Sequence, residues 1–182
     1  TEDNIYSPVL LTGSTGFLGS YVLTELVKKG LLDQVHLFMR SAPRKESVLG
    51  CRFRDAELSL DTLSKNTHLI DLKDEASFLE KLAQLEKISK SWRVVHLAAV
   101  INPKGDLESQ EKVNFDRTLQ LLEWANKNAK SFIYTSSVVA FGATPTKVMR
   151  CESDYSNYHW LNKIDGYSTT KRKAHDAILK NA

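Results

Sequence analysis

The sequence predicts an α/β fold in which helices pack on both faces of a parallel sheet. Short apolar runs of strand length alternate along the chain with amphipathic patterns of helix length. The first apolar run leads directly into a glycine-rich turn and then into a helical pattern. Because right-handed crossovers join successive parallel strands, we expect a doubly wound sheet of the Rossmann type.

Five strands are expected, each followed by a helix or by a loop that leads into one. They span residues 8–12, 35–39, 68–70, 93–98 and 132–135. The helix after the first strand carries an apolar stripe, and Gly30 is its expected stop. Further helices are expected over 78–85, from about 107 to 126, and from about 165 to the end. The stretch from the second strand to about residue 60 is basic and is expected to be irregular.

Length and composition set broad limits on the class of protein. A chain of 182 residues is long enough for one domain with a real core, which we expect to span residues 1–182. The net charge of +3 is too small to imply a nucleic-acid partner. The longest apolar runs have strand length, so neither a membrane span nor a signal peptide is expected. Cys51 and Cys151 form no metal-type or redox-type pair and suit the reducing cytoplasm, while a single disulfide between them stays open as an alternative. The histidines lack metal-ligand spacing.

The glycine-rich turn predicts a phosphate-binding site. Gly13, Gly16 and Gly19 are spaced three residues apart, between the first strand and the first helix. One glycine permits the tight turn, one lets the backbone approach a pyrophosphate, and one permits close packing of the helix. Backbone N–H groups and the positive end of the helix then hold the phosphate. The alternative is a turn without a ligand, but the strand–turn–helix context favours a dinucleotide.

Residues after the second and third strands predict which dinucleotide binds. An acidic residue after the second strand would accept hydrogen bonds from the free 2′-hydroxyl of NAD, but this sequence has Arg40 there, followed by Arg44 and Lys45. Guanidinium groups pair with phosphate, so we expect the cofactor to be NADP. Two alternatives stay open: the cofactor is NAD, or the basic residues only form a solvated loop. Asp71 and Leu72 end the third strand, where Asp71 either accepts from the adenine amino group or caps the next helix.

Tyr167 and Lys171 predict a proton-transfer site. They are four residues apart and therefore lie on one face of a helix. A tyrosine has a pKa of about 10, and a nearby cation favours its ionised form. Tyr167 could then protonate a carbonyl oxygen as a hydride reaches the carbon, while Lys171 also holds ribose hydroxyls. Ser137 follows the fifth strand, where its hydroxyl could orient and polarise the carbonyl.

Other residues have weaker signals. A lone tyrosine–lysine pair is more often a solvated pair, so its interpretation depends on the glycine turn and the chain order. His96 ends a buried strand and is expected to be a structural histidine. Aromatic residues crowd the loop before the last helix, where they either line an apolar substrate or pack against their own domain: Tyr155, Tyr158, His159 and Trp160.

The ordered set of motifs resembles the extended branch of the short-chain dehydrogenase/reductases, over almost the whole chain. The set comprises Thr12-Gly13-x-x-Gly16-x-x-Gly19, His96-Leu97-Ala98-Ala99, Asn114, Ser136-Ser137 and Tyr167-x-x-x-Lys171. The resemblance implies Ser137, Tyr167 and Lys171 as the catalytic group, with Asn114 supporting the active-site backbone and a water. The expected cofactor contacts come from the glycine turn, from the ends of the strands and from the residues that the resemblance adds. They are Thr12, Gly13, Thr15, Gly16, Phe17, Leu18, Gly19, Arg40, Asp71, Leu72, Ala98, Ala99, Ser136, Tyr167 and Lys171.

Within that branch, residues 10–19 and the strand ending at Arg40 look most like thioester and fatty acyl reductases. Our leading hypothesis is an NADP-dependent oxidoreductase that reduces a small-molecule carbonyl, aldehyde or thioester. Sugar-nucleotide epimerases or dehydratases with a tightly held NAD share most of these residues and stay open as an alternative. A non-catalytic domain that senses NADP or acts as a scaffold is a further alternative.

The carboxyl end departs from the pattern that the resemblance implies. Extended members continue with a further strand and a small substrate-binding domain, and the sequence stops after the tyrosine–lysine helix at Ala182. We therefore expect a truncated sheet whose fifth strand leaves an exposed edge. Such an edge pairs readily with another chain, so a carboxyl-terminal domain or a second copy is an expected partner.

Overall fold

The computed structural model describes residues 7–63, 65–101, 107–142 and 166–181. The chain divides into two compact units. The first comprises Thr1–Ala98 and Leu122–Tyr134, and the second comprises Ala99–Leu121 and Thr135–Ala182. The whole sheet belongs to the first unit, and the helix with Tyr167 and Lys171 belongs to the second.

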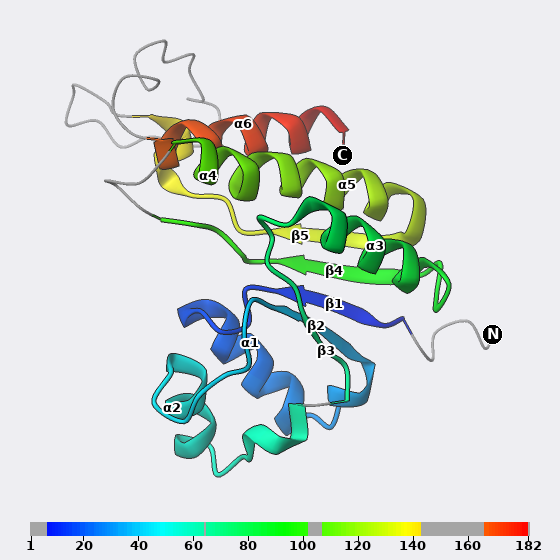
Figure 1. Ribbon diagram of the computed structural model, residues 1–182, viewed down its shortest axis with the longest axis vertical. Helices are drawn as coiled ribbons and strands as arrows, with labels where there is room; N and C mark the ends of the chain where they lie inside the picture. The colour runs from blue at the N-terminus through cyan, green and yellow to red at the C-terminus, as the bar shows by residue number, and fades with distance from the viewer. Residues whose placement is uncertain (1–6, 64, 102–106, 143–165, 182) are drawn as a thin grey trace. The chain divides into compact units, whose positions relative to one another are not determined.

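The first unit is built on a parallel five-stranded sheet with the order β3-β2-β1-β4-β5 (Figure 1). The order confirms the predicted doubly wound arrangement. It reverses between β1 and β4, and sheets of this kind bind ligands at the carboxyl ends of the strands at that point. The strands are β1 Val9–Thr12, β2 Val35–Met39, β3 Thr67–Leu69, β4 Trp92–His96 and β5 Ala129–Tyr134.

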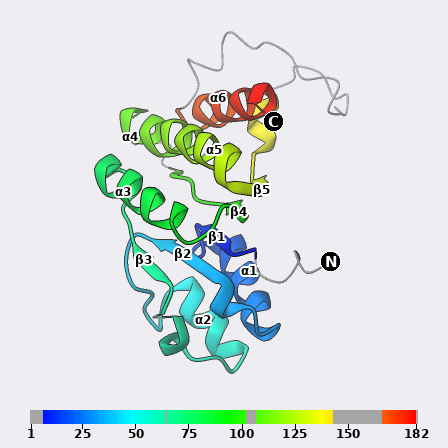
Figure 2. The same cartoon turned by 90° about the vertical axis from the view of Figure 1, so that its right-hand side faces the viewer.

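Helices lie on both faces of this sheet, as Figure 2 shows for α1 and α3. On one face, α1 (Phe17–Lys28) and α2 (Val48–Asp55) bury Leu23 and Phe53 with alternate residues of β1 and β2. On the other face, Phe78 of α3 (Glu75–Glu86) meets Phe38 of β2 edge-to-face, with 6.1 Å between the ring centroids. All of β2 is buried, as expected for a parallel strand with both faces covered.

The prediction that the stretch after the second strand is irregular is wrong, because this stretch contains the helix α2 (Val48–Asp55). The Ser47 hydroxyl caps this helix by accepting a hydrogen bond from the Gly50 N–H at 3.1 Å. Leu49 and Phe53, four residues apart, are fully buried in the core. One apolar pair in an eight-residue helix is too short a pattern to stand out among basic residues.

The expected stop of the first helix is confirmed. Gly30 has a φ of +69°, the left-handed conformation that glycine adopts without strain. Its N–H donates to the Val27 carbonyl at 2.9 Å, and the Leu31 N–H donates to the Leu26 carbonyl at 3.0 Å. This pair of bonds is a Schellman motif, which satisfies the last carbonyls of α1.

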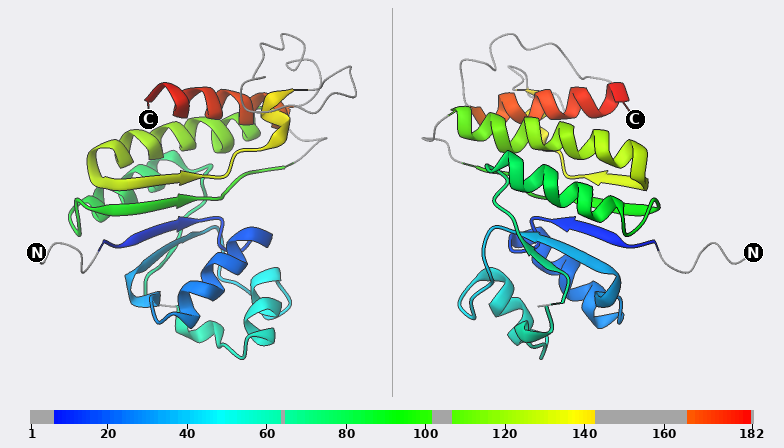
Figure 3. Two further views of the ribbon diagram at one scale, coloured as in Figure 1. Left: turned by 180° about the vertical axis from the view of Figure 1, so that it is seen from behind. Right: turned by 45° about the vertical axis from the view of Figure 1, so that its right-hand side comes forward.

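The second unit is mainly helical. Its elements are α4 (Leu107–Glu111), a π-helical segment (Lys112–Asp116), the start of α5 (Arg117–Asn128), a short 3₁₀ turn (Val138–Phe141) and α6 (Gly166–Asn181). Figure 3 shows α6 running alongside α4. One long helix was expected here, and the π-segment interrupts it. No helix in the described part of the chain is long and apolar enough to cross a membrane.

The strand β5 forms one edge of the sheet within the described residues, as expected. Its Ile133 side chain is 56% exposed, which is high for an isoleucine in a strand. That another chain pairs with this edge stays a prediction.

Candidate functional site

The glycine turn after β1 is shaped by two glycines that have no room for a side chain. Gly13 has a φ of +75°, and a Cβ atom there would lie 2.6 Å from the Ala98 backbone nitrogen. A Cβ atom on Gly19 would lie 2.1 Å from the Gly13 carbonyl oxygen. Gly16 differs, since the nearest atom to its Cβ position is 3.4 Å away. The turn therefore packs tightly against the end of β4 and against α1, and it leaves Gly16 on an open side.

The amino terminus of α1 suits a phosphate group. Gly16 is its N-cap and supplies no side-chain hydrogen bond, and the first turn of the helix has no acidic residue. By contrast, Ser47 caps α2 and Asp74 caps α3. A helix end without a side-chain cap keeps N–H donors and a positive dipole end available for an anion. Phe17 and Leu18 in this turn are 72% and 48% exposed, so a ligand can reach it. The chain's own residues thus fit the pyrophosphate of a dinucleotide.

Thr12 joins the ends of β1 and β4. Its Oγ1 lies 2.6 Å from His96 Nδ1 and accepts a hydrogen bond from the Ala98 N–H at 3.2 Å. Both side chains are buried, and the His96 ring stacks on the Tyr134 ring with 5.8 Å between centroids. The expectation that His96 is structural is confirmed. Thr12 therefore contributes to this site indirectly, because its hydroxyl fixes the position of the Ala98 backbone.

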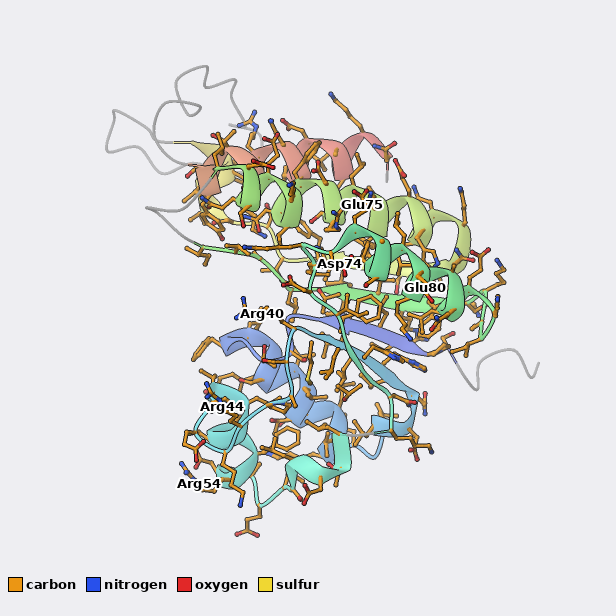
Figure 4. The ribbon with its side chains drawn as sticks, in the orientation of Figure 1. Arg40, Arg44, Arg54, Asp74, Glu75 and Glu80 are labelled. Atoms are coloured by element: carbon orange, nitrogen blue, oxygen red, sulfur yellow. The ribbon has the colours of Figure 1, made fainter. Side chains whose placement is uncertain are left out.

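Basic residues follow β2, at the expected adenosine end of the site. Figure 4 shows Arg40 at the carboxyl end of β2 and Arg44 beside α2. Both side chains are exposed, and residues 40–45 include no acid. The loop is held against α2, because a Cβ atom on Gly50 would lie 2.2 Å from the Arg44 carbonyl oxygen. The Ser47 hydroxyl also donates to that carbonyl at 2.6 Å.

The two aspartates after β3, Asp71 and Asp74, have different hydrogen-bond partners. Asp74, not Asp71, caps α3 by accepting from the Ser77 N–H at 3.1 Å. The alternative that Asp71 caps this helix is therefore wrong. Asp71 Oδ1 accepts from the Lys73 N–H at 3.0 Å, and the carboxylate is exposed beside the half-buried Leu72.

In the second unit, Asn114 ties three segments together. It lies in the π-helical segment and is buried. Its Oδ1 accepts from the Val100 N–H at 2.7 Å, and its Nδ2 donates to the Val100 carbonyl at 2.9 Å and to Thr170 Oγ1 at 3.2 Å. Asn114 thus fixes the backbone after β4 to α6, and such π-segments are frequent at functional sites.

Lys171 is a buried cation on α6. Its side chain is 3% exposed, and its Nζ donates to the Thr135 carbonyl at 2.8 Å. Burial lowers the pKa of Lys171 to about 8, because removing the ammonium group from water disfavours its charged form. Tyr167 lies one turn earlier and is half-buried. The structure therefore brings Asn114, Lys171 and the segment that carries Ser137 into one unit.

Ser136 and Ser137 follow β5, and one of their partners was missed in the sequence. Ser137 caps the 3₁₀ turn, with its Oγ accepting from the Val139 N–H at 3.4 Å. Ser136 Oγ lies 3.0 Å from His175 Nδ1 and shares a hydrogen bond with it. The only signal for His175 is its position four residues after Lys171.

Some expected site residues are not described. Tyr155, Tyr158, His159 and Trp160 lie outside the described residues, as does Cys151. Within the described ranges, no group of three or more His, Cys, Asp or Glu side chains could hold a metal ion.

The comparison with protein families is consistent with this geometry. A model of the NAD dependent epimerase/dehydratase family matches residues 9–181, and the chain therefore belongs to that family. The family is part of the extended short-chain dehydrogenase/reductases, so the resemblance in the motifs is confirmed. The family is described as NAD dependent, and some of the structural neighbours were solved in complex with NAD.

Individual relatives have different activities. The chain is 29% identical over 163 residues to a polyketide synthase-nonribosomal peptide synthetase, pyiS, from Pyricularia grisea, covering 90% of this chain and 4% of that protein. The UDP-Glc/GlcNAc 4-epimerase from Campylobacter jejuni has a TM-score of 0.70 at 22% identity, covering 96% of this chain and 49% of the epimerase. WbmG from Bordetella bronchiseptica, solved with NAD, has a TM-score of 0.66 at 17% identity, covering 99% and 51%. The chain spans about half of these structures.

We predict that Gly13→Ala abolishes dinucleotide binding and lowers the melting temperature. The new Cβ would lie 2.6 Å from the Ala98 nitrogen, so the turn must separate from β4. Gly30→Ala is the matched control, because Gly30 also has a positive φ but has no atom within 4 Å of its Cβ position. It should cost about 1 kcal/mol of stability and leave binding intact. Thermal unfolding and calorimetric titration with NADPH measure both effects, and equal binding losses would contradict the assignment.

We predict that stability rises with pH through Lys171. Its pKa is about 8 in the folded chain and near 10.5 when unfolded, so between these values the unfolded chain binds more protons. The free energy of unfolding should therefore rise with pH over that window, and by less in Lys171→Met. Urea denaturation across the window measures the two slopes. Lys180→Met changes an exposed lysine of α6 and controls for the loss of a lysine. If the free energy of unfolding rises with pH equally in Lys171→Met and in the unaltered chain, the prediction is refuted.

Proposed function

We propose that this chain is an NADP-dependent oxidoreductase that reduces a carbonyl, aldehyde or thioester by hydride transfer. The observation that carries the proposal is the buried Lys171 on α6, one turn after Tyr167. A buried cation is costly to the fold, and perturbed groups of this kind cluster at functional sites. The thioester type is proposed from residues 10–19 and the strand before Arg40, which resemble thioester and fatty acyl reductases.

The cofactor proposal depends on the two phosphate-binding features of the first unit. The uncapped amino terminus of α1 would hold the pyrophosphate. The exposed Arg40, which directly follows β2, would pair with a 2′-phosphate, and no acid among residues 40–45 competes for the ribose. These residues favour NADP over NAD. A nicotinamide dinucleotide, when bound, supplies the donation or acceptance of a hydride.

The catalytic proposal assigns one task to each residue of the second unit. Tyr167 donates its phenolic proton to the carbonyl oxygen, which becomes a hydroxyl as the carbon is reduced. Lys171 favours the tyrosinate that remains, because an ammonium group stabilises a nearby anion. The Ser137 hydroxyl orients and polarises the carbonyl. Asn114 holds the backbone at Val100 and, through Thr170, holds α6 in place.

A sugar-nucleotide epimerase or dehydratase is the second candidate, favoured by the matching family and by the likeness to the Campylobacter jejuni epimerase. Such an enzyme would use the same residues with a tightly held NAD. We propose that residues 1–182 form an NAD(P)-binding domain, and the chain spans about half of the structures that it resembles. Under the leading proposal, added NADPH is consumed with substrate, whereas an epimerase leaves it unchanged.

We predict that Tyr167→Phe lowers kcat by roughly 10²- to 10⁴-fold, which is the usual contribution of a general acid. NADPH binding should be unchanged, because phenylalanine retains the ring and loses only the hydroxyl. Steady-state NADPH oxidation with a panel of aldehydes, ketones and acyl thioesters provides the measurement. Tyr21→Phe removes a hydroxyl from an exposed tyrosine of α1 and serves as the control. A Tyr167→Phe variant with full activity would overturn the assigned role.

We predict that Arg40→Asp reverses the cofactor preference. Loss of a charge-assisted hydrogen bond and repulsion of the phosphate should weaken NADPH binding relative to NADH by roughly ten-fold or more. Titration calorimetry with both cofactors measures the ratio. Arg54→Asp places the same change on exposed Arg54 of α2 and should leave the ratio as it is. An unchanged ratio in Arg40→Asp would eliminate the NADP assignment.

A further inference from the structure

The segment Thr135–Gly142, called here the serine segment, runs beside α6 (Figure 3). Hydrogen bonds anchor it to α6 on both sides of Ser137. Before Ser137, Lys171 Nζ donates to the Thr135 carbonyl at 2.8 Å. After it, Arg172 Nη1 donates to the Ala140 carbonyl at 2.9 Å. These bonds hold the backbone of the segment, and all of these residues belong to the second unit.

His175 makes the third and fourth anchors with its ring. Its Nδ1 lies 3.0 Å from Ser136 Oγ, within hydrogen-bond distance. Its ring also packs on the Phe141 ring, with 6.0 Å between the centroids at an angle of 59°. His175 therefore touches both ends of the stretch that carries Ser137.

The position of Ser137 depends on these anchors, because the hydrogen bond that its own hydroxyl makes is weak. The bond from the Val139 N–H to Ser137 Oγ is 3.4 Å long, beyond the usual 2.7–3.2 Å range. That bond also lies within the segment and cannot fix it to another element. The orientation of Ser137 follows from how its neighbours are held.

We propose that His175 is a positioning residue that fixes Ser137 for catalysis through Ser136 and Phe141. Tyr167, Lys171 and His175 follow one another at four-residue intervals, so His175 extends the face that carries the two proposed catalytic residues. The inference rests on the proposed function, because it assigns Ser137 the task of orienting the substrate carbonyl. It adds a residue outside the motifs that define the catalytic group.

The test compares His175→Ala with His175→Asn in the full chain. Alanine removes both anchors, and we expect kcat to fall about 10- to 100-fold with an unchanged KM for NADPH, since small displacements of an orienting group have effects of this size. Asparagine places an amide atom near the position of Nδ1, so it should restore most of kcat. Lys180→Ala, at the exposed end of α6, is the control and should leave kcat as it is.

A double-mutant cycle separates positioning from general loosening of the fold. Ser136→Ala should lower kcat through the same hydrogen bond, and Ser136→Ala with His175→Ala should lower it less than the product of the single effects. Additive losses would overturn the proposed coupling.

Hydrogen exchange gives a readout that needs no turnover. The Ala140 N–H donates to the Ser137 carbonyl at 3.0 Å, and the Gly142 N–H donates to the Val139 carbonyl at 3.1 Å. Both amides should exchange faster in His175→Ala and recover in His175→Asn. Unchanged exchange, or faster exchange with an unchanged kcat, would overturn the proposal. If the unaltered chain turns over no substrate and exchange still responds to His175→Ala, the anchor is supported and the proposed function fails.

Discussion

The close contact between the ends of β1 and β4 is the constraint on which the first unit depends. The Thr12 hydroxyl lies 2.6 Å from His96 and accepts from Ala98, so both strand ends are held by one buried side chain. One residue later, the Gly13 backbone comes so close to Ala98 that no Cβ atom fits. Because strand order reverses at this pair, the contact positions the turn, and with it the uncapped start of α1, at the point where such sheets bind ligands.

The second unit has a comparable constraint in the buried Lys171. Lys171 is 3% exposed, and burial of an ammonium group is unfavourable unless polar groups compensate. The Thr135 carbonyl is one of these groups. Asn114 makes the neighbouring polar contacts, to Val100 and to Thr170 of α6. The unit thus maintains a lysine whose pKa is lowered to about 8, and the catalytic role that we propose for Lys171 would explain this cost to stability.

Local patterns in the sequence predicted the elements that local physics determines. The strand β2 was predicted with its observed bounds, and Gly30 ends α1 as expected. The helix α2 was missed because eight residues with one buried apolar pair make a weak pattern. The π-segment at Asn114 was missed, because nothing in its five residues marks a change in the backbone hydrogen bonding of the helix. The family was predicted correctly, because its short motifs follow one another in a recognisable order along the sequence.

The features of the site that could not be predicted from the sequence depend on contacts between residues far apart in the chain. Ser136 and His175 are 39 residues apart, and no periodic pattern joins them. Thr12 reads as part of the turn motif, and only the sheet register, which places it beside His96, shows that its hydroxyl is enclosed. The exclusion of Asp71 as the cap of α3 likewise needed the backbone geometry around Asp74.

Under the proposed function, the chain transfers a hydride to a substrate carbonyl and consumes its cofactor. The most direct measurement follows deuterium from NADPH labelled at C4 of the nicotinamide ring into the product, together with the oxidised cofactor formed. Hydride transfer to the carbonyl should leave one deuterium on the former carbonyl carbon and form one NADP⁺ for each carbonyl reduced. Product that forms without deuterium and without net oxidation of the cofactor would contradict it, and would indicate an epimerase-type reaction.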